Sequence, residues 1–335
     1  MKISLGVTML GGIALAVGLV VYLGAGAVLG TLAALGWGLV PIVLVHIVQL
    51  WCCGMSWRAL IPAAWPRPVG VLTALRWIRE GTNGLLPVAH IGGEIIGARL
   101  LSFRGVRGDI AGASVVVNLT VEVVTQVFFT LAGVAALLGM GRGGHDLGRI
   151  GLSILVGAIA VAGFVIAQRV GLFRLIEHAL DRMMKTAQWL SLDGVRGLHD
   201  AIQEMHGRPR ALAASGAWHL LGWVLGTLEV WVALVFMGIP VGLREAFILE
   251  SLGQAARSAG FAVPSGVGVQ EAGYLVTGAM LGLAPETALA LSLAKRLREV
   301  GMGLPALLAW QWLEGRRLWR HRSASAATGS QKDLA

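Results

Sequence analysis

The sequence predicts an all-α integral membrane protein, and its composition, long apolar runs and an internal repeat all indicate this class. Of the 335 residues, 56% are hydrophobic and 13% are charged, with a mean hydropathy of +0.74. Soluble domains carry about a quarter charged residues, which cover their surfaces. Apolar runs of about 18 residues or more recur along the chain and can cross a hydrocarbon core of ~30 Å. Composition therefore excludes a soluble enzyme, a nucleic-acid-binding domain and a disordered chain.

Six apolar segments predict full membrane spans. They are residues 4–23, 33–53, 110–140, 152–168, 211–237 and 284–312. The first resembles a signal peptide, but it is long and has no clear cleavage site, so we expect an uncleaved span. Two more stretches, 71–101 and 246–282, are apolar but contain a Pro and several Gly, which interrupt helices. We expect these two to be broken re-entrant hairpins.

The basic residues are distributed unevenly over this map. Most of the 27 Lys and Arg lie in segments that are cytoplasmic if the N-terminus is cytoplasmic, and the C-terminus is then cytoplasmic too. This positive-inside pattern explains the net charge of +9 without a nucleic acid. Segment 169–210 mixes both signs of charge and predicts an amphipathic cytoplasmic helix or helix pair, lying on the headgroups. The basic tail, 314–335, is expected to be disordered.

An internal repeat relates the two interrupted stretches, because a shift of 177 residues aligns them without a gap. The identical pairs are Pro87 and Pro264, Glu94 and Glu271, Gly105 and Gly282, Ala111 and Ala288, Ala113 and Ala290, Glu122 and Glu299, and Val123 and Val300. Each half, 1–140 and 141–313, reads as two spans, a broken hairpin and a span, an odd number of crossings. The second half is therefore inverted, as in secondary transporters, whose substrate site lies where the broken segments meet. The alternative is that the hairpins merely pack.

Acidic residues within the apolar stretches are the first candidates for a site. A charge in the hydrocarbon zone costs several kcal/mol unless it is paired or hydrated. Glu94 and Glu271 are repeat mates that either carry a proton or cap an unwound helix end. Glu229 and Glu250 are interpreted as structural partners for the intramembrane Arg.

A polar stripe marks the last span and the third. Lys295, Arg298 and Glu299 share one helix face, with Arg296 turned aside, and Asn118 and Glu122 occupy the matching positions of the third span. We expect Lys295 and Glu299 to pair at i, i+4. The remaining positive charge would be met by Glu122 or by a lipid phosphate. The hypothesis is a path for an anionic or polar lipid head, lined by Arg257, Lys295, Arg296 and Arg298.

The sequence predicts no cofactor, no metal and no catalytic constellation. Cys52 and Cys53 are adjacent in an apolar run and have no metal-ligand spacing. His46 and His219 lie in predicted spans and are interpreted as core histidines whose hydrogen bonds are satisfied. The glycines of 267–273 follow no strand, which argues against a nucleotide-binding loop.

A family resemblance emerges from these motifs. The segments 263–272 (VPSGVGVQEA) and 282–290 (GLAPETALA) resemble a signature of the lysylphosphatidylglycerol synthase transmembrane-region, or flippase-like, family. In the first half Leu86-Pro87, Gly93-Glu94, Arg99-Leu100-Leu101 and Asp109 are similar to its pattern. The resemblance spans about 70–312. Residues 254–257 and 292–299 most resemble the hopanoid-biosynthesis-associated flippases of bacteria, and Gln270 stands where many members have Arg. The candidate substrate-binding residues are Glu94, Arg99, Glu122, Arg257, Pro264, Gln270, Glu271, Lys295, Arg296, Arg298 and Glu299.

The resemblance implies a protein of the bacterial inner membrane that moves a hopanoid or an anionic phospholipid between leaflets. A gradient, proton coupling through a Glu or simple scrambling would drive this motion. Its partners would be membrane lipids and lipid-biosynthesis enzymes. Because no aminoacyl-transferase domain follows residue 335, aminoacyl transfer is not expected. The alternatives are a membrane-embedded hydrolase of lipid headgroups, such as a lipid-pyrophosphate hydrolase, and a non-transporting accessory subunit of lipid synthesis.

Overall fold

A computed structural model describes residues 26, 30, 33–86, 92–140, 192–259 and 268–332, and in this part of the chain every regular element is helical. Within these ranges, the side chains of residues 192–196 and 317–332 are not described. The elements are η1 (Gly36–Gly38), α3 (Leu39–Leu60), α4 (Val69–Leu85), α5 (Gly92–Ser102), α6 (Gly108–Leu138), α9 (Leu192–His206), α10 (Pro209–Phe236), α11 (Leu243–Ala259), α12 (Val269–Leu281) and α13 (Pro285–Lys332).

Three of the described helices are long and apolar enough to cross a membrane. They are Ala33–Leu60, Gly108–Leu138 and Pro209–Phe236, and they coincide with the second, third and fifth predicted spans. Large apolar side chains such as Leu44, Phe128 and Val224 project from them, uncovered by protein. Such a surface suits a lipid environment, because lipid tails can cover it. The predicted spans 4–23 and 152–168 lie outside the described residues.

The last predicted span, 284–312, lies within α13 but is not one of these three helices. Charged residues at 295, 296, 298 and 299 interrupt its apolar character. The tail predicted to be disordered from 314 is instead helical as far as Lys332. Residues 314–332 contain no Pro and only two Gly, so the sequence there does not stop a helix.

Each of the two interrupted stretches is a pair of helices, in agreement with the prediction that neither is one straight helix. In the first, α4 ends at Leu85 and Leu86 is extended, as expected for the residue before Pro87. In the second, α11 ends at Ala259 and α12 begins after Gly268, whose φ of 83° favours glycine. The Pro and Gly of the sequence therefore divide both stretches.

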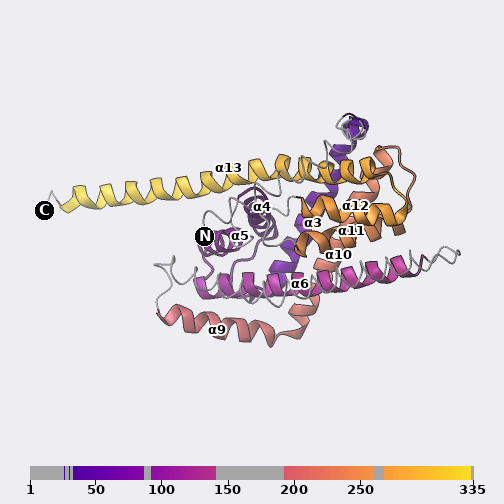
Figure 1. Ribbon diagram of the computed structural model, residues 1–335. Helices are drawn as coiled ribbons and strands as arrows, with labels where there is room; N and C mark the ends of the chain where they lie inside the picture. Colours follow the sequence, from indigo (N-terminus) through magenta and orange to yellow (C-terminus); the bar gives the residue numbers. More distant parts are fainter. Residues whose placement is uncertain are drawn as a thin grey trace.

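The helices pack into one body in which α6 and α13 run along opposite sides (Figure 1). Between them α3 packs along α10, α4 packs against α13 and α5, and α11 packs against α6 and α12. One apolar core contains Trp57, Leu72, Leu101 and Val115. A second contains Ile42, Val230, Leu249 and Leu291. Buried charged side chains lie in the same body and form the candidate site.

The described part of the predicted cytoplasmic segment 169–210 contains α9, which packs on α6 (Figure 1). Its residues Leu198, Ala201 and Met205 are buried in the first apolar core. The helix is amphipathic as predicted, but its apolar face is covered by the protein's own helices, where the sequence suggested contact with headgroups.

Candidate functional site

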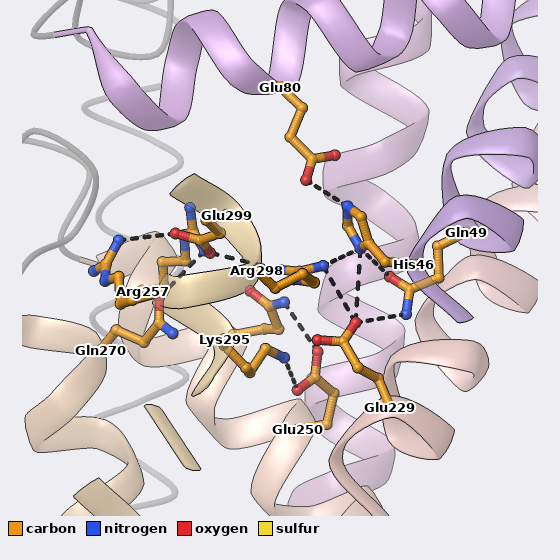
Figure 2. A network of polar contacts seen from close by, with 12 residues as sticks. His46, Gln49, Glu80, Glu229, Glu250, Arg257, Gln270, Lys295, Arg298 and Glu299 are labelled. Carbon is orange, nitrogen blue, oxygen red and sulfur yellow. Dashed lines mark hydrogen bonds and ion pairs between the residues drawn. The ribbon is translucent and has the colours of Figure 1, made fainter. Parts of the chain in front are cut away.

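Two groups of buried polar side chains lie among the helices. The first, here the α13 cluster, surrounds the charged stripe of α13. Its members are His46, Gln49, Glu80, Glu229, Glu250, Arg257, Gln270, Glu271, Lys295, Arg296, Arg298 and Glu299 (ten are labelled in Figure 2). The second, here the α6 cluster, consists of Ser56, Arg76, Arg79, Asn83, Glu94, Asn118, Glu122, Ser215 and His219.

Lys295 is held by Glu250 of α11 rather than by Glu299. Its Nζ lies 2.5 Å from Oε2 of Glu250, which also accepts a hydrogen bond from the Tyr274 hydroxyl at 3.0 Å. Gln254 donates to the other oxygen of Glu250 at 3.0 Å. The predicted i, i+4 pair is therefore wrong, because a carboxylate on a neighbouring helix reaches the ammonium.

Glu299 instead forms ion pairs with the arginines around it (Figure 2). It pairs with Arg257 of α11, with Nη1 of Arg296 at 3.0 Å and with Arg298 at 3.7 Å. Arg257 also donates to the Gln270 side chain on α12 at 3.2 Å. One carboxylate on α13 therefore links α11 and α12 to α13.

Arg298 points the other way, toward α3 and α10. Its Nη1 lies 3.2 Å from Oε2 of Glu229 and donates to Nδ1 of His46. The opposite ring nitrogen of His46, Nε2, lies 2.8 Å from Glu80 on α4. Four helices thus meet at Arg298 and His46, and the interpretation of Glu229 as a structural partner of an Arg is confirmed by this geometry.

Glu271 caps the helix on which it lies. Its Oε2 accepts the backbone N–H of Gly268 at 2.6 Å, at the start of α12, while Oε1 faces Nε of Arg296 at 3.2 Å. A carboxylate at a helix N-terminus is favourable, because the first N–H groups of a helix lack partners within it. Of the two roles considered for Glu271, the geometry shows the cap. Arg296 is not turned aside, because it connects Glu271 with Glu299.

The α13 cluster has no surplus of positive charge, contrary to the expectation from the sequence. Four cations face five carboxylates, so its formal charge is −1 with His46 neutral. The cations are Arg257, Lys295, Arg296 and Arg298, and the carboxylates are Glu80, Glu229, Glu250, Glu271 and Glu299. The stripe on α13 looked cationic because most of the compensating acids lie on α4, α10, α11 and α12.

Most of the α13 cluster is deeply buried, but three of its charged members are partly exposed. The side chains of Lys295, Arg298 and Glu229 are at most 5% exposed. The partly exposed ones are Glu80 at 36%, Arg257 at 20% and Arg296 at 16%. Buried ion pairs repay their desolvation only when they are well paired. These partly exposed side chains are therefore where a polar ligand could exchange with a carboxylate.

The α6 cluster is built from two Arg–Glu pairs. Arg76 donates to both oxygens of Glu122, at 2.7 and 2.5 Å, and Arg79 pairs with Glu94. Asn83 donates to Glu94 at 3.3 Å. The expected approach of Glu122 to the cations of α13 is thus replaced by a bidentate pair with Arg76 of α4. Both arginines of this cluster are at most 13% exposed.

Neutral polar groups complete the α6 cluster. The Asn118 side chain lies 3.4 Å from Arg79, 3.1 Å from Ser56 and 3.1 Å from Nε2 of His219. His219 is thus a buried histidine with a hydrogen-bond partner, as predicted.

The structure gathers most of the predicted site residues but divides them between two places. Glu94 and Glu122 are in the α6 cluster, and seven others are in the α13 cluster: Arg257, Gln270, Glu271, Lys295, Arg296, Arg298 and Glu299. Arg99 lies outside both, 47% exposed and 3.2 Å from Glu314. Pro264 lies outside the described residues.

Sequence reasoning missed Glu80, Arg76 and Arg79, and it gave His46 only a core role. A signal for Glu80 was available, because the 177-residue shift that defines the repeat places it on Arg257. Arg76, Arg79 and Glu80 also recur at i, i+3 and i+4, the spacing of one helix face. Nothing in the sequence shows that His46 faces α13.

Comparison with known proteins gives one match. A family model described as "Lysylphosphatidylglycerol synthase TM region" matches residues 9–306. Searches of the curated proteins and of the solved structures returned no match.

Proposed function

The chain belongs to the lysylphosphatidylglycerol synthase TM region family, and from this premise we propose that it moves a lipid between membrane leaflets. The family indicates a membrane protein tied to lipid handling. The cargo we propose is a hopanoid or an anionic phospholipid of the bacterial inner membrane. We further propose that both termini are cytoplasmic and that the protein acts without chemical catalysis, in contact with lipid-biosynthesis enzymes.

The observation on which this proposal rests is the α13 cluster, an ionic network in an apolar body that reaches the protein surface at Glu80 and Arg257. An arginine presents a fork of donors that fits a phosphate oxygen pair as well as it fits a carboxylate. A phosphate at Arg257 would replace Glu299 as its partner, and a neutral polar head would hydrogen-bond to the same groups. The lipid tails would remain in the bilayer.

An inverted repeat would let such a site face both leaflets in turn, and the helix boundaries and contacts support it. Adding 177 to Gly92 and Gly108, the first residues of α5 and α6, gives Val269 and Pro285, the first residues of α12 and α13. The contacts between helices follow the same relation. α4 packs on α13, and their counterparts in the other half, α11 and α6, pack on each other. In inverted-repeat transporters one half rocks against the other around a fixed site.

The test is translocation by the purified protein in liposomes that contain headgroup-labelled phospholipid or hopanoid. The loss of label from the outer leaflet is followed for wild type and for Glu271→Gln. The amide keeps an acceptor for Gly268 but removes the charge beside Arg296, and one charged hydrogen bond is worth about 1.5–3 kcal/mol. We therefore expect translocation to slow about tenfold or more. Glu204→Gln, on the exposed face of α9, is the matched control and should keep the wild-type rate.

The same preparation separates the rival functions. Release of phosphate from a lipid pyrophosphate without translocation would identify a headgroup hydrolase. Stable co-purification with lipid-synthesis enzymes, with no translocation under a pH gradient of either sign, would identify an accessory subunit. Either result would contradict the proposal.

A further inference from the structure

His46 lies among charged side chains of the α13 cluster, which a histidine that only packs in an apolar core would not need. It contacts charged groups from three other helices: Glu80 of α4, Glu229 of α10 and Arg298 of α13. The amide oxygen Oε1 of Gln49, one turn along α3, lies 3.3 Å from Nδ1, the ring nitrogen that Arg298 also contacts. The imidazole is 8% exposed, and among these three charged neighbours only Glu80 is more than 5% exposed.

The contacts of His46 fit two protonation states, because Nδ1 faces the donor Arg298 as well as the acceptor oxygens of Gln49 and Glu229. In the first state Nδ1 accepts the hydrogen bond from Arg298, because a guanidinium has only donors. The proton of the neutral ring is then on Nε2, where it is donated to Glu80 over 2.8 Å. His46 is therefore neutral while Arg298 is bound to it, and Arg298 occupies the lone pair that a second proton would need.

Glu229 lacks the donors that a buried carboxylate requires. Its Oε2 receives Gln49 at 3.0 Å and Arg298 at 3.2 Å, but Oε1 accepts no hydrogen bond from any described residue, although the side chain is 2% exposed. Nε of Arg298 is buried too and donates to no described group. An unmet polar group in an apolar interior is costly, so Glu229 has room for another donor.

The charge balance of the cluster also leaves room for one proton. The described carboxylates of the α13 cluster outnumber its cations by one, and His46 is the one member of the cluster whose ordinary titration range lies near neutral pH. One proton on His46 would make the cluster formally neutral. The new Nδ1–H would face Oε2 of Glu229, now 3.6 Å away.

We propose that His46 is the proton-binding site of this protein, where a proton and Arg298 compete for Nδ1. A proton taken from water forms an Nδ1–H bond and breaks the hydrogen bond from Arg298. The imidazolium is then held between Glu80 and Glu229, and Arg298 is free to move toward Glu299 or toward an anionic headgroup. This inference rests on the proposed function, for which it identifies the coupling ion.

The first test needs no lipid. An infrared difference spectrum of the purified protein between about pH 8 and about pH 5 spans the usual range of imidazole titration. We expect an imidazolium band and a shift of an arginine guanidinium band to appear together. In His46→Gln the arginine shift should be absent and the imidazolium band should lose the share that His46 contributes among the eight histidines, because glutamine can accept from Arg298 and donate to Glu80 but does not titrate. His199→Gln, an exposed histidine of α9, is the control and should retain the arginine shift.

A second variant keeps the proposal testable if His46→Gln does not fold. Glu80→Gln lies at the exposed edge of the cluster and keeps an acceptor for Nε2, but it removes a charge that stabilises the imidazolium. The coupled bands should shrink. An arginine shift of wild-type size in His46→Gln, or an imidazolium band without any arginine shift in wild type, would overturn the proposal.

The second test uses the liposomes. For one coupled proton, a pH difference of one unit changes the distribution of the lipid about tenfold. Wild type should show this dependence, and His46→Gln should move lipid equally under either sign of gradient. Gradient dependence that persists in His46→Gln would refute the proton site and leave lipid transport standing. Coupled bands in a protein that moves no lipid would support the proton site and refute the proposed function.

Discussion

The α6 cluster and the α13 cluster occupy related positions but differ in charge balance. Glu94 and Glu122 of the first are repeat mates of Glu271 and Glu299 of the second. The α6 cluster balances two arginines with two glutamates, each pair on adjacent helices. The α13 cluster has one carboxylate more than it has cations, and a histidine in direct contact with an arginine. A balanced set of pairs stabilises one structure, whereas an unbalanced one can exchange partners.

One pair of positions in the predicted repeat illustrates how the two clusters differ. Asn118 and Lys295 are repeat mates, and both are at most 3% exposed. Asn118 bonds to neutral groups and Arg79, while Lys295 bonds to Glu250. The neutral residue completes a set of fixed pairs, and the charged one adds a further ion pair to the network in which we place transport.

The comparison of the two clusters predicts the largest loss of stability for Arg79→Leu. This change leaves the buried Glu94 with Asn83 alone at 3.3 Å and also removes the guanidinium over Trp57, 4.8 Å from its ring centroid. Breaking a buried pair from one side costs about 3–5 kcal/mol. Lys295→Met leaves Glu250 with the donors of Tyr274 and Gln254, so a smaller loss of about 1–3 kcal/mol is expected. Thermal unfolding in detergent measures both.

The double variant Arg79→Leu with Glu94→Leu is the control for that experiment. With no charge left unpaired, it should recover most of the lost stability. Equal losses for Arg79→Leu and Lys295→Met would show that the two clusters hold the fold equally. The distinction between a fixed and an exchangeable network would then fail.

The second prediction compares the repeat mates Glu299 and Glu122 in transport. Glu299→Gln removes the charge shared by Arg257, Arg296 and Arg298, and translocation should slow about tenfold or more. Glu122→Gln disturbs one pair with Arg76 and should change the rate about threefold at most, with some loss of stability. The liposome assay measures the two rates side by side. A greater slowing by Glu122→Gln would place the working site in the α6 cluster.

The sequence predicted the helices better than the side-chain partners. Apolar runs located α3, α6 and α10, and Pro and Gly located the breaks in both interrupted stretches. Pairing across helices depends on the register between them, which the period of one helix does not encode. Lys295 therefore pairs with Glu250, and Glu122 with Arg76. His46 shows the limit most clearly, because its contact with Arg298 is visible only when α3 and α13 are placed together.

The smallest predicted effect concerns Arg99, the candidate that lies outside both clusters. Its partner Glu314 is 3.2 Å away, and Arg99 itself is 47% exposed and stacks 5.4 Å from the Phe103 ring. Exposed ion pairs contribute about 0–1 kcal/mol. Arg99→Ala should therefore lower stability by less than about 1 kcal/mol and leave translocation at the wild-type rate. Arg257→Ala, which removes a partner of Glu299 and Gln270, should slow translocation about tenfold or more. If Arg99→Ala were as slow as Arg257→Ala, headgroup binding would extend to the contact between α5 and α13, and the α13 cluster would not be the whole site.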